Sequence, residues 1–156
     1  MEGPRRKPIR LVGWDYATPG HYFVTLVTQA RCELFGKVHD GEVALGEVGR
    51  LAEAEWIRLS RDASTIALDA FVVMPNHLHG IVGLSDDVGP SLSEIVRIYK
   101  SRVTRRAQTL GFEGNVWQRG FHDRILRDQA GLEAARRYIA ANPSRWAHDP
   151  EAPRAR

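Results

Sequence analysis

The sequence predicts an α+β fold built on one antiparallel sheet, and three observations lead to this class. Short stretches rich in β-branched and aromatic residues alternate with longer segments whose apolar residues recur every three or four positions. These segments follow the order strand, helix, strand, strand, helix, strand, with one extra helix at the end. Only Pro75-Asn76 separates the two middle strands, which makes them a hairpin. This order fits a split βαβ sheet of ferredoxin-like type with helices on one face.

The first half of the chain supplies three strands, a small hairpin and one helix. His21–Gln29 is rich in β-branched and aromatic residues and predicts the first strand. Asp40-Gly41 lies between two valines and signals a hairpin turn. Glu47–Leu59 has a helical apolar period. Thr65–Met74 and His77–Leu84 form the central hairpin.

The second half supplies two helices and the last strand. Ser91 or Ser93 caps a helix that runs to about residue 108. We expect a strand over Val116–Leu126 and a final helix over Ala130–Ala141. This helix stops at Asn142-Pro143, because the residue before a proline resists helical geometry.

The chain length fits a single domain. Its 156 residues are enough for a sizeable core, and we place the domain at residues 1–148. Within it, residues 1–20 form a basic N-terminal arm, and residues 149–156 form a flexible tail. No apolar run approaches the about 20 residues that span a bilayer, and the N-terminus lacks the apolar segment of a signal peptide. With Cys32 as the only cysteine, these features predict a cytoplasmic protein without a membrane partner.

The charge is distributed unevenly along the chain. Up to Pro90 there are 9 Lys and Arg residues against 12 Asp and Glu, whereas from Ser91 onward there are 13 against 7. A basic second half suggests a polyanion held against that part of the protein. The alternative is a solvated surface that happens to be rich in arginine.

The helix that follows Ser91 concentrates these basic residues on its polar faces. They are candidates for phosphate contacts, which would give salt-sensitive and largely sequence-independent binding to DNA. The arm adds further basic residues that could support such binding, among them Arg5 and Arg6. A solvated helix face remains the alternative. The candidates on the helix are Arg97, Lys100, Arg102, Arg105 and Arg106.

The segment His77-Leu78-His79 opens the second strand of the central hairpin. Residues two apart in a strand lie on the same face, so the two imidazoles project side by side. Two imidazoles in this arrangement can share one metal ion. The alternative is a pair of ordinary polar residues on an exposed sheet face.

The final helix offers a second set of reactive groups. Leu132, Ala135 and Ile139 form its apolar stripe, and Tyr138 and Asn142 lie one turn apart beside that stripe. If this helix packs beside the histidine strand, Asn142 can complete a metal site and Tyr138 can face the ion. A structural tyrosine at a helix–sheet boundary is the alternative. Elsewhere, Tyr99 falls on an apolar stripe and is expected in the core.

Three motifs together resemble a known family. The segments VVMPNHLHGIV, VWQRGFHDRIL and RRYIAANPSRW occur in this order, and the chain from about Ile9 to Trp146 resembles the single-tyrosine HUH transposases of the IS200-like type. The resemblance is closest to the REP-associated tyrosine transposases. It implies a ferredoxin-like domain that nicks and rejoins single-stranded DNA near imperfect hairpins, in association with the nucleoid.

The resemblance also implies roles for individual residues. His77 and His79 match the family's metal-binding histidine pair, Tyr138 matches the tyrosine that attacks DNA, and Asn142 matches a third metal ligand. The implied ion is Mg²⁺ or Mn²⁺, although two imidazoles alone suit zinc or manganese.

Other residues match the family's pattern without an assigned role in the reaction. Trp117 and Gln118 match a Trp-Gln pair typical of the family and are expected to support the site. Arg124 stands where many relatives have histidine, and His122 is nearby but out of register.

Three functions remain open at this stage. The first is a metal-dependent transposase that forms a 5′-phosphotyrosine with DNA. The second is a non-catalytic protein, derived from such an enzyme, that binds hairpins or single strands. The third is a metal hydrolase that uses water, with Tyr138 structural. Whether the protein is a monomer or a homodimer is also open.

Overall fold

A computed structural model of the protein describes residues 20–85 and 88–148. The predicted arm, including Arg5 and Arg6, and the predicted tail lie outside the described residues, except that Gly20 begins the first strand. The main-sheet strands are β1 (Gly20–Val27), β4 (Ile66–Met74), β5 (His77–Leu84) and β6 (His122–Leu126). The helices are α1 (Glu47–Asp62), α2 (Leu92–Thr109) and α3 (Gln129–Ala141). A hairpin of β2 (Gly36–His39) and β3 (Glu42–Leu45) and the short 3₁₀ helices η1 (Gln29–Arg31) and η2 (Pro143–His148) complete the described elements.

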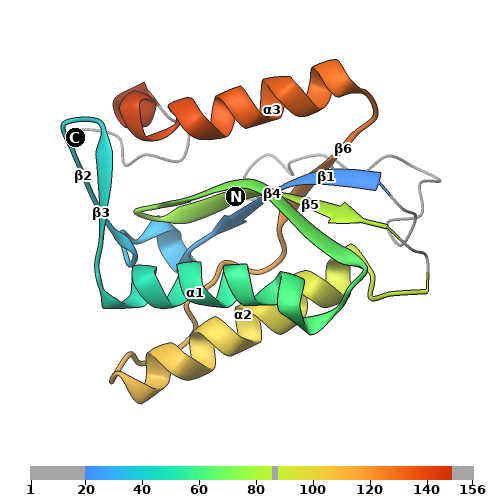
Figure 1. The fold of residues 1–156 in the computed structure, drawn as a ribbon. Coiled ribbons are helices and arrows are strands. Elements are labelled where there is room, and N and C mark those ends of the chain that lie inside the picture. Colours follow the sequence, from blue (N-terminus) through green and yellow to red (C-terminus); the bar gives the residue numbers. More distant parts are fainter. Residues whose placement is uncertain (1–19, 86–87, 149–156) are drawn as a thin grey trace, which may run out of the picture.

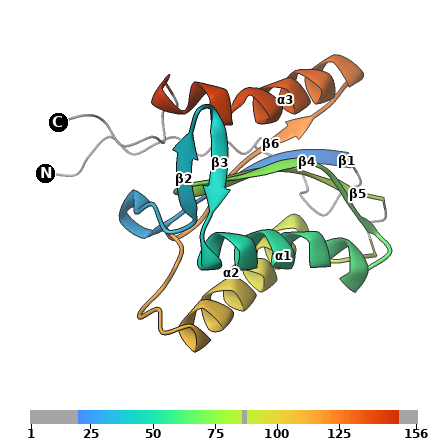
Figure 2. The same ribbon diagram turned by 60° about the vertical axis from the view of Figure 1, so that its left-hand side comes forward.

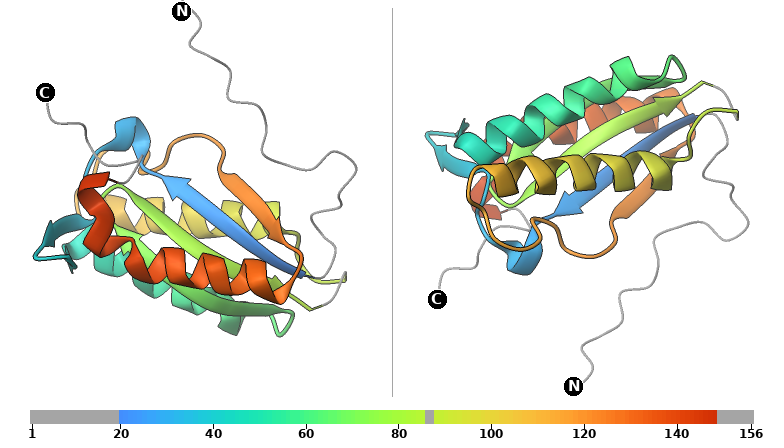
Figure 3. Two further views of the ribbon diagram at one scale, coloured as in Figure 1. Left: turned by 90° about the horizontal axis from the view of Figure 1, so that it is seen from above. Right: turned by 90° about the horizontal axis from the view of Figure 1, so that it is seen from below.

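The main sheet has the strand order β4-β5-β1-β6, with every neighbouring pair antiparallel. This order confirms the predicted ferredoxin-like sheet. The two helices of the βαβ units, α1 and α2, pack together on one face (Figure 1). The extra helix α3 lies on the other face, over β4 and β5 (Figure 3).

The strand predicted over residues 116–126 is too long. Only His122–Leu126 pairs with β1, and the preceding residues form a loop joined to the end of β1 by a single bridge between Thr28 and Trp117. Gly120 explains the break, because its φ of 77° lies in the left-handed region, which is incompatible with an extended strand. The 40–41 turn and the cap at Ser91 were predicted correctly, since Asp40 and Gly41 have positive φ and the Ser91 side chain accepts from the Glu94 amide.

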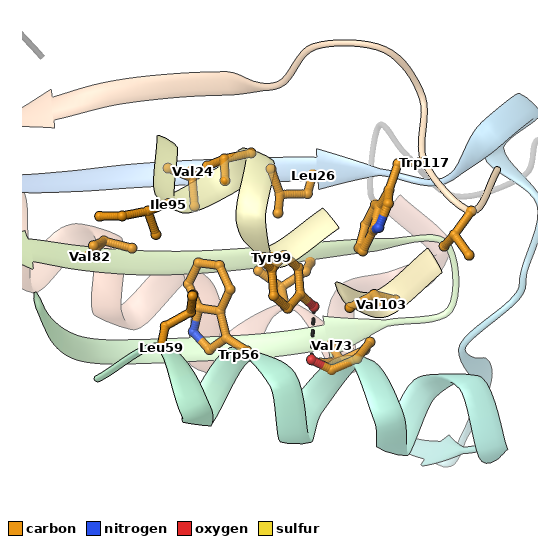
Figure 4. Packing of buried hydrophobic residues seen from close by; sticks show 14 of the residues in the cluster. Val24, Leu26, Trp56, Leu59, Val73, Val82, Ile95, Tyr99, Val103 and Trp117 are labelled. Atoms are coloured by element: carbon orange, nitrogen blue, oxygen red, sulfur yellow. Dashed lines mark hydrogen bonds between the residues drawn. The ribbon is translucent and has the colours of Figure 1, made fainter. Parts of the chain in front are cut away.

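The main core lies between the sheet and the helix pair α1 and α2. Tyr99 is fully buried there, as predicted, and its hydroxyl donates to the Ala52 carbonyl oxygen at 2.8 Å. Figure 4 shows its ring between those of Trp56 and Trp117, with ring centroids 5.2 and 5.6 Å away. Trp117 is therefore a core residue that anchors the loop before β6 onto α2.

Alternation along β5 explains why a glycine follows the histidine pair. Leu78 and Gly80 face the main core, whereas His77 and His79 face α3. A Cβ atom at Gly80 would come within 2.5 Å of the Trp56 ring. The absence of a side chain at Gly80 thus lets Trp56 pack directly beneath the strand that carries the histidines.

A smaller apolar cluster attaches α3 to the opposite sheet face. Its buried members are Ile81, Leu126, Leu132, Ala135 and Ile139. The last three are the apolar stripe predicted for the final helix. In the view of Figure 2, α3 and η2 cross above β4 next to the β2–β3 hairpin, which contacts η2. No helix within residues 20–85 and 88–148 is long and apolar enough to cross a membrane.

Candidate functional site

The two histidines of β5 lie under α3 with their rings in contact. The ring centroids of His77 and His79 are 4.5 Å apart, and the two side chains are 0% and 4% exposed. The fold therefore encloses the pair, whereas a polar pair on an open sheet face would be exposed. Burial, together with the neighbouring His77, lowers the pKa of His79 well below its ordinary value of 6.5. The imidazole of His79 is thus neutral, which is the form that binds metal ions.

A buried asparagine determines which nitrogen of His77 carries the proton. The Asn76 amide nitrogen donates to the Arg31 carbonyl oxygen at 3.3 Å, so its amide oxygen is the atom 2.8 Å from His77 Nδ1. An amide oxygen can only accept, hence a neutral His77 is protonated on Nδ1. The lone pair then lies on Nε2, as in metal sites where an outer hydrogen bond fixes the ligand's tautomer.

Thr25 does the same for His79. Its hydroxyl oxygen is 2.9 Å from His79 Nδ1, and within the described residues His79 Nε2 is buried with no hydrogen-bond partner. A proton on Nε2 would be an unsatisfied buried donor, whereas a proton on Nδ1 is accepted by Thr25. In neutral His77 and His79, Nε2 is therefore the unprotonated nitrogen, the one that could bind a metal ion.

Helix α3 brings Tyr138 to this pair. The tyrosine ring meets His79 edge-on with centroids 5.4 Å apart, and it makes a second edge contact with Phe23 at 6.0 Å. The side chain remains 42% exposed. A phenol that touches a buried imidazole and also reaches solvent is placed to meet a substrate from outside.

Asn142 follows Tyr138 by one helical turn and caps α3. Four residues later, Trp146 of η2 stacks on His77 with centroids 6.0 Å apart. Asn142 thus lies between two contacts to the histidine pair along the chain. Its side chain is 3% exposed, and its amide oxygen is buried without a partner among residues 20–85 and 88–148.

These residues fit a divalent metal ion through an imidazole–amide ligand set. Within the described part of the chain, no group of three or more His, Cys, Asp or Glu side chains could hold a metal ion. A metal site here would therefore depend on the Asn142 oxygen in addition to the histidine nitrogens. The buried Nε2 of His79 and the buried Oδ1 of Asn142 each offer a lone pair that no described residue uses.

An ion pair fixes α3 to the sheet two residues before Tyr138. Arg136 Nε donates to Asp69 Oδ1 at 2.8 Å, and a second guanidinium nitrogen donates to Asp69 Oδ2 at 2.7 Å. Asp69 lies in a β-bulge of β4, where the register with β5 shifts between Leu68 and Phe71. The Arg136 hydrogen bonds lower the pKa of Asp69 to about 2. This two-bond geometry restricts rotation of α3 more than a single contact would.

Comparisons with known proteins agree with this architecture. No family model matches the chain. An uncharacterised protein of Haemophilus influenzae is 29% identical over 164 positions, which cover 92% of this chain and 91% of that protein. A solved structure of a REP-associated tyrosine transposase bound to a REP hairpin is similar over 93% of this chain and 74% of that chain, at 25% identity and a TM-score of 0.62. The chain is thus similar in fold and sequence to a REP-associated tyrosine transposase.

A further structure, of a candidate transposase from Deinococcus radiodurans R1, covers 85% of this chain and 96% of that chain. Its identity is 16% and its TM-score 0.49. The architecture described above is similar in fold to that of the REP-associated tyrosine transposase.

The basic residues predicted to bind DNA lie on α2, across the sheet from the histidine pair. Two of them pair with α1: Arg102 with Asp62, and Arg106 with Glu55 at 2.7 Å. Lys100 donates to the carbonyl oxygens of Gln118 and Gly120, and burial lowers its pKa to about 8. Arg97 and Arg105 are exposed. The structure thus brings Tyr138 against the histidine pair, with Asn142 buried one helical turn after it, and places the predicted arginine helix on the other face.

The two residues of the Trp-Gln pair, which were expected to support the site, lie in different environments. Trp117 is in the core, whereas Gln118 is exposed and its backbone amide donates to the Val27 carbonyl oxygen. On β6, the guanidinium carbon of Arg124 lies 5.3 Å from the centroid of the Phe23 ring. His122 of β6 is the cross-strand partner of Thr25 on β1. His122 is thus two strands from His79, in the same cross-strand row.

Sequence reasoning missed four residues that arrange the site: Thr25, Asp69, Asn76 and Trp146. Asn76 carried a usable signal, because it directly precedes His77 in a two-residue turn and an amide there can reach the ring. The others gave none, since their partners are 54, 67 and 69 positions away in the sequence.

The ion pair between α3 and β4 should be measurable as stability. Arg136→Lys keeps the charge but loses the second hydrogen bond to Asp69, so we expect the free energy of unfolding at pH 7 to fall. Urea denaturation measures this, with Arg137→Lys, an exposed neighbour on the same helix, as the matched control. Equal stability of the two variants would show that the paired hydrogen bonds from Arg136 to Asp69 do not fix α3. The stabilisation should also persist down to pH 3.8 and be lost as the pH falls towards 2, where Asp69 takes up its proton.

Burial of neutral His79 should make the metal-free protein sensitive to mild acid. The pKa of His79 in the folded state is below its unfolded value of 6.5, so the unfolded state binds more protons below that pH. The stabilisation is therefore fully present above pH 6.5 and declines as the pH falls, by at most about 1.4 kcal/mol per pH unit. Urea denaturation with EDTA at pH 7.5 and 5.5 should show a smaller loss for His79→Gln than for the unmodified protein. The control is His39→Gln, at an exposed histidine, and a pH dependence of His79→Gln equal to that control would contradict the assignment.

Proposed function

We propose that this protein nicks and rejoins single-stranded DNA near hairpins, in a divalent-metal-dependent reaction that passes through a 5′-phosphotyrosine at Tyr138. One observation carries the proposal. A half-exposed phenol touches a buried, neutral histidine, one helical turn before a buried amide oxygen that has no partner in the described chain. A structural tyrosine would have no need of these neighbours.

The covalent step follows from the position of Tyr138. Its hydroxyl oxygen attacks the phosphorus of the scissile phosphodiester, and the bond from phosphorus to the 3′-oxygen breaks. The phenolic proton passes to solvent water, and the departing 3′-oxygen takes up a proton from solvent to become a hydroxyl. The ordinary pKa of tyrosine, about 10, makes a free phenol a poor nucleophile, so positioning and charge stabilisation must supply the rate.

Rejoining is the same step in reverse. A 3′-hydroxyl attacks the phosphotyrosine, a new phosphodiester forms, and the phenol of Tyr138 is released. The phosphotyrosine linkage is itself a phosphodiester and keeps the energy of the broken DNA bond, so rejoining needs no other energy source. Attack by water would instead end the reaction at cleavage.

His77, His79 and Asn142 would hold the metal ion, which we propose to be Mg²⁺ or Mn²⁺. When bound, the ion would polarise the scissile phosphate and offset negative charge in the transition state. Asn76 and Thr25 keep the histidine protons on Nδ1, so that both Nε2 atoms are available as ligands. The edge contact between His79 and Tyr138 keeps the nucleophile beside that site.

The solved relative supports a DNA hairpin as the partner, because that transposase was captured with a REP hairpin. We propose hairpin-bearing single-stranded DNA as the ligand of this chain and action near the nucleoid, by one protomer or a homodimer. Of the α2 candidates, Arg97, Lys100 and Arg105 have no carboxylate partner among the described residues, so they are the better phosphate contacts.

Removal of the phenolic oxygen should abolish cleavage while retaining DNA binding. Tyr138→Phe keeps the ring that packs on His79 and Phe23, so we expect at least a 1,000-fold loss of adduct, on the order of the loss of an essential nucleophile. The assay incubates hairpin-bearing single-stranded DNA with Mn²⁺ and detects a denaturation-resistant protein–DNA adduct on a gel. Tyr99→Phe, which removes a phenol on the other side of the sheet, should still form the adduct.

The same assay separates the three functions. Cleavage by Tyr138→Phe without an adduct would establish a water-using hydrolase. Binding without any adduct for the unmodified protein, with every divalent ion tried, would establish a non-catalytic hairpin-binding protein.

Replacing the amide oxygen of Asn142 should weaken metal binding without unfolding the protein. In Asn142→Leu a buried oxygen without a hydrogen bond is exchanged for apolar atoms of similar size, so the melting temperature should not fall. Mn²⁺ affinity, measured by titration calorimetry at pH 7.5, should fall by about 10- to 100-fold. The control is Gln129→Leu, at the exposed amide at the other end of α3. Unchanged Mn²⁺ affinity would exclude Asn142 as a ligand.

A further inference from the structure

Each of the two histidines has an aromatic ring stacked on one face. The Trp146 ring lies on His77, with centroids 6.0 Å apart and an angle of 25° between the planes. The Phe23 ring lies on His79 in the same way, at 5.3 Å and 29°. Between these pairs the two imidazoles meet edge to face, at 4.5 Å and 69°. The four rings therefore form one continuous row with the imidazoles inside it, hereafter the four-ring row.

The two ends of the four-ring row are held by different parts of the fold. Phe23 is on β1, two residues before Thr25, which is the cross-strand neighbour of His79. Strand pairing therefore fixes that end of the row. Trp146 is on η2, the short helix that follows α3. The position of the other end thus depends on where η2 is held.

The β2–β3 hairpin holds η2 in place. Its turn at Asp40 and Gly41 lies against η2, since a Cβ atom at Gly41 would be 3.6 Å from the Cα of Ser144 (Figure 2). The Ser144 hydroxyl also donates to the Ala141 carbonyl oxygen at 2.9 Å, which ties η2 to the end of α3. Trp146 is therefore carried by a helix that is supported from two sides.

Stacking restricts a motion that the hydrogen bonds to the histidines leave open. The bonds involving Thr25 and Asn76 reach the rings at Nδ1. A ring held at one atom can still tilt about that atom, and its Nε2 lone pair changes direction with the tilt. A planar ring packed on the face of an imidazole opposes this tilt, because tilting breaks the contact between the two planes. Two lone pairs converge on one ion only when both planes are held.

The surroundings of Trp146 differ from those of a tryptophan that fills a core. Trp56 and Trp117 are fully or almost fully buried in the main apolar cluster. Trp146 is half-buried and belongs to neither of the two apolar clusters formed by described residues. Its ring contact within the described chain is with His77. The indole is thus placed for the histidine and not for the core.

We propose that Trp146 and Phe23 are positioning residues that hold the ring planes of His77 and His79, so that the two Nε2 atoms point to one divalent ion. The β2–β3 hairpin contributes by supporting η2. This inference rests on the proposed function for the existence of the metal site. Both aromatic side chains act through the histidines, and neither is assigned a contact with the ion or with DNA.

Two substitutions at the same position separate positioning from simple space filling. Trp146→Phe keeps a planar ring, whereas Trp146→Leu keeps an apolar side chain without a plane. In titration calorimetry with Mn²⁺ at pH 7.5, we expect the affinity to fall by about 2- to 10-fold in Trp146→Leu, the worth of one aromatic contact, and by less than about 2-fold in Trp146→Phe. Phe23→Leu should resemble Trp146→Leu. The control is Arg145→Leu, at an exposed neighbour on η2.

The visible absorption of bound Co²⁺ gives a second readout, because it depends on how the ligands are arranged around the ion. At saturating Co²⁺ the spectrum of Trp146→Leu should differ from that of the unmodified protein, and the spectrum of Trp146→Phe should not. Thermal denaturation in EDTA shows whether each variant is folded. If Phe23→Leu does not fold, the two variants of Trp146 decide the outcome.

The possible failures are distinguishable. Unchanged Mn²⁺ affinity and an unchanged Co²⁺ spectrum in Trp146→Leu would overturn the positioning role alone. An equal loss of affinity in Trp146→Phe and Trp146→Leu, with unchanged spectra, would also overturn it, because the indole would then only fill space. If the unmodified protein binds neither Mn²⁺ nor Co²⁺, the proposed metal site is refuted and this inference with it.

Discussion

The docking of α3 on the sheet is the constraint on which the rest of the site depends. The groups of the candidate site come from two parts of the fold, since the histidines are on β5, Tyr138 is on α3 and Asn142 caps that helix. Three apolar side chains of α3 set its depth on the sheet, and the bonds from Arg136 to Asp69 restrict its rotation. A helix held by the apolar stripe alone could roll, because dispersion and burial are not directional. The β-bulge at Asp69 thus serves the site although it lies outside it.

Burial beneath α3 gives the histidine pair its chemical character. Removal from water keeps His79 neutral, and hydrogen bonds to Thr25 and Asn76 place the protons on Nδ1 and leave both Nε2 atoms unprotonated. The hydrogen bond from Asn76 to the Arg31 carbonyl also ties the histidine strand to the segment after β1. Ala30 and Arg31 both have a φ of 55°, an uncommon value for residues other than glycine. Such strained turns are frequent at functional sites, where surrounding contacts hold them in place.

The two faces of the sheet have different tasks. The α1–α2 face is a closed core centred on Trp56, Tyr99 and Trp117, and it makes the sheet rigid (Figure 4). The α3 face is only half covered, over β4 and β5, which leaves β1 and β6 beside the described site (Figure 3). Trp117 joins the two faces, because it anchors in the core the loop that leads into β6 at the other end of the sheet.

The sequence by itself determined the elements and much of their chemistry. Hydrophobic periodicity and turn residues predicted the strand and helix order, the ferredoxin-like sheet, the core position of Tyr99 and the apolar stripe of α3. Strand alternation placed His77 and His79 on one face, and helical spacing placed Tyr138 and Asn142 one turn apart. These are local relations, fixed by backbone geometry over a few residues. The length of the last strand was misjudged, because the positive φ of Gly120 does not alter the apolar pattern around it.

Only the tertiary structure decided which surfaces meet. It put α3 over β5 with Tyr138 against His79, and it paired Asp69 with Arg136 across 67 positions of sequence. It also separated the arginine helix from the site and committed Arg102 and Arg106 to carboxylates of α1. No local pattern encodes these outcomes. Each depends on how segments that are far apart in the sequence pack against one another, and that is a property of the folded chain as a whole.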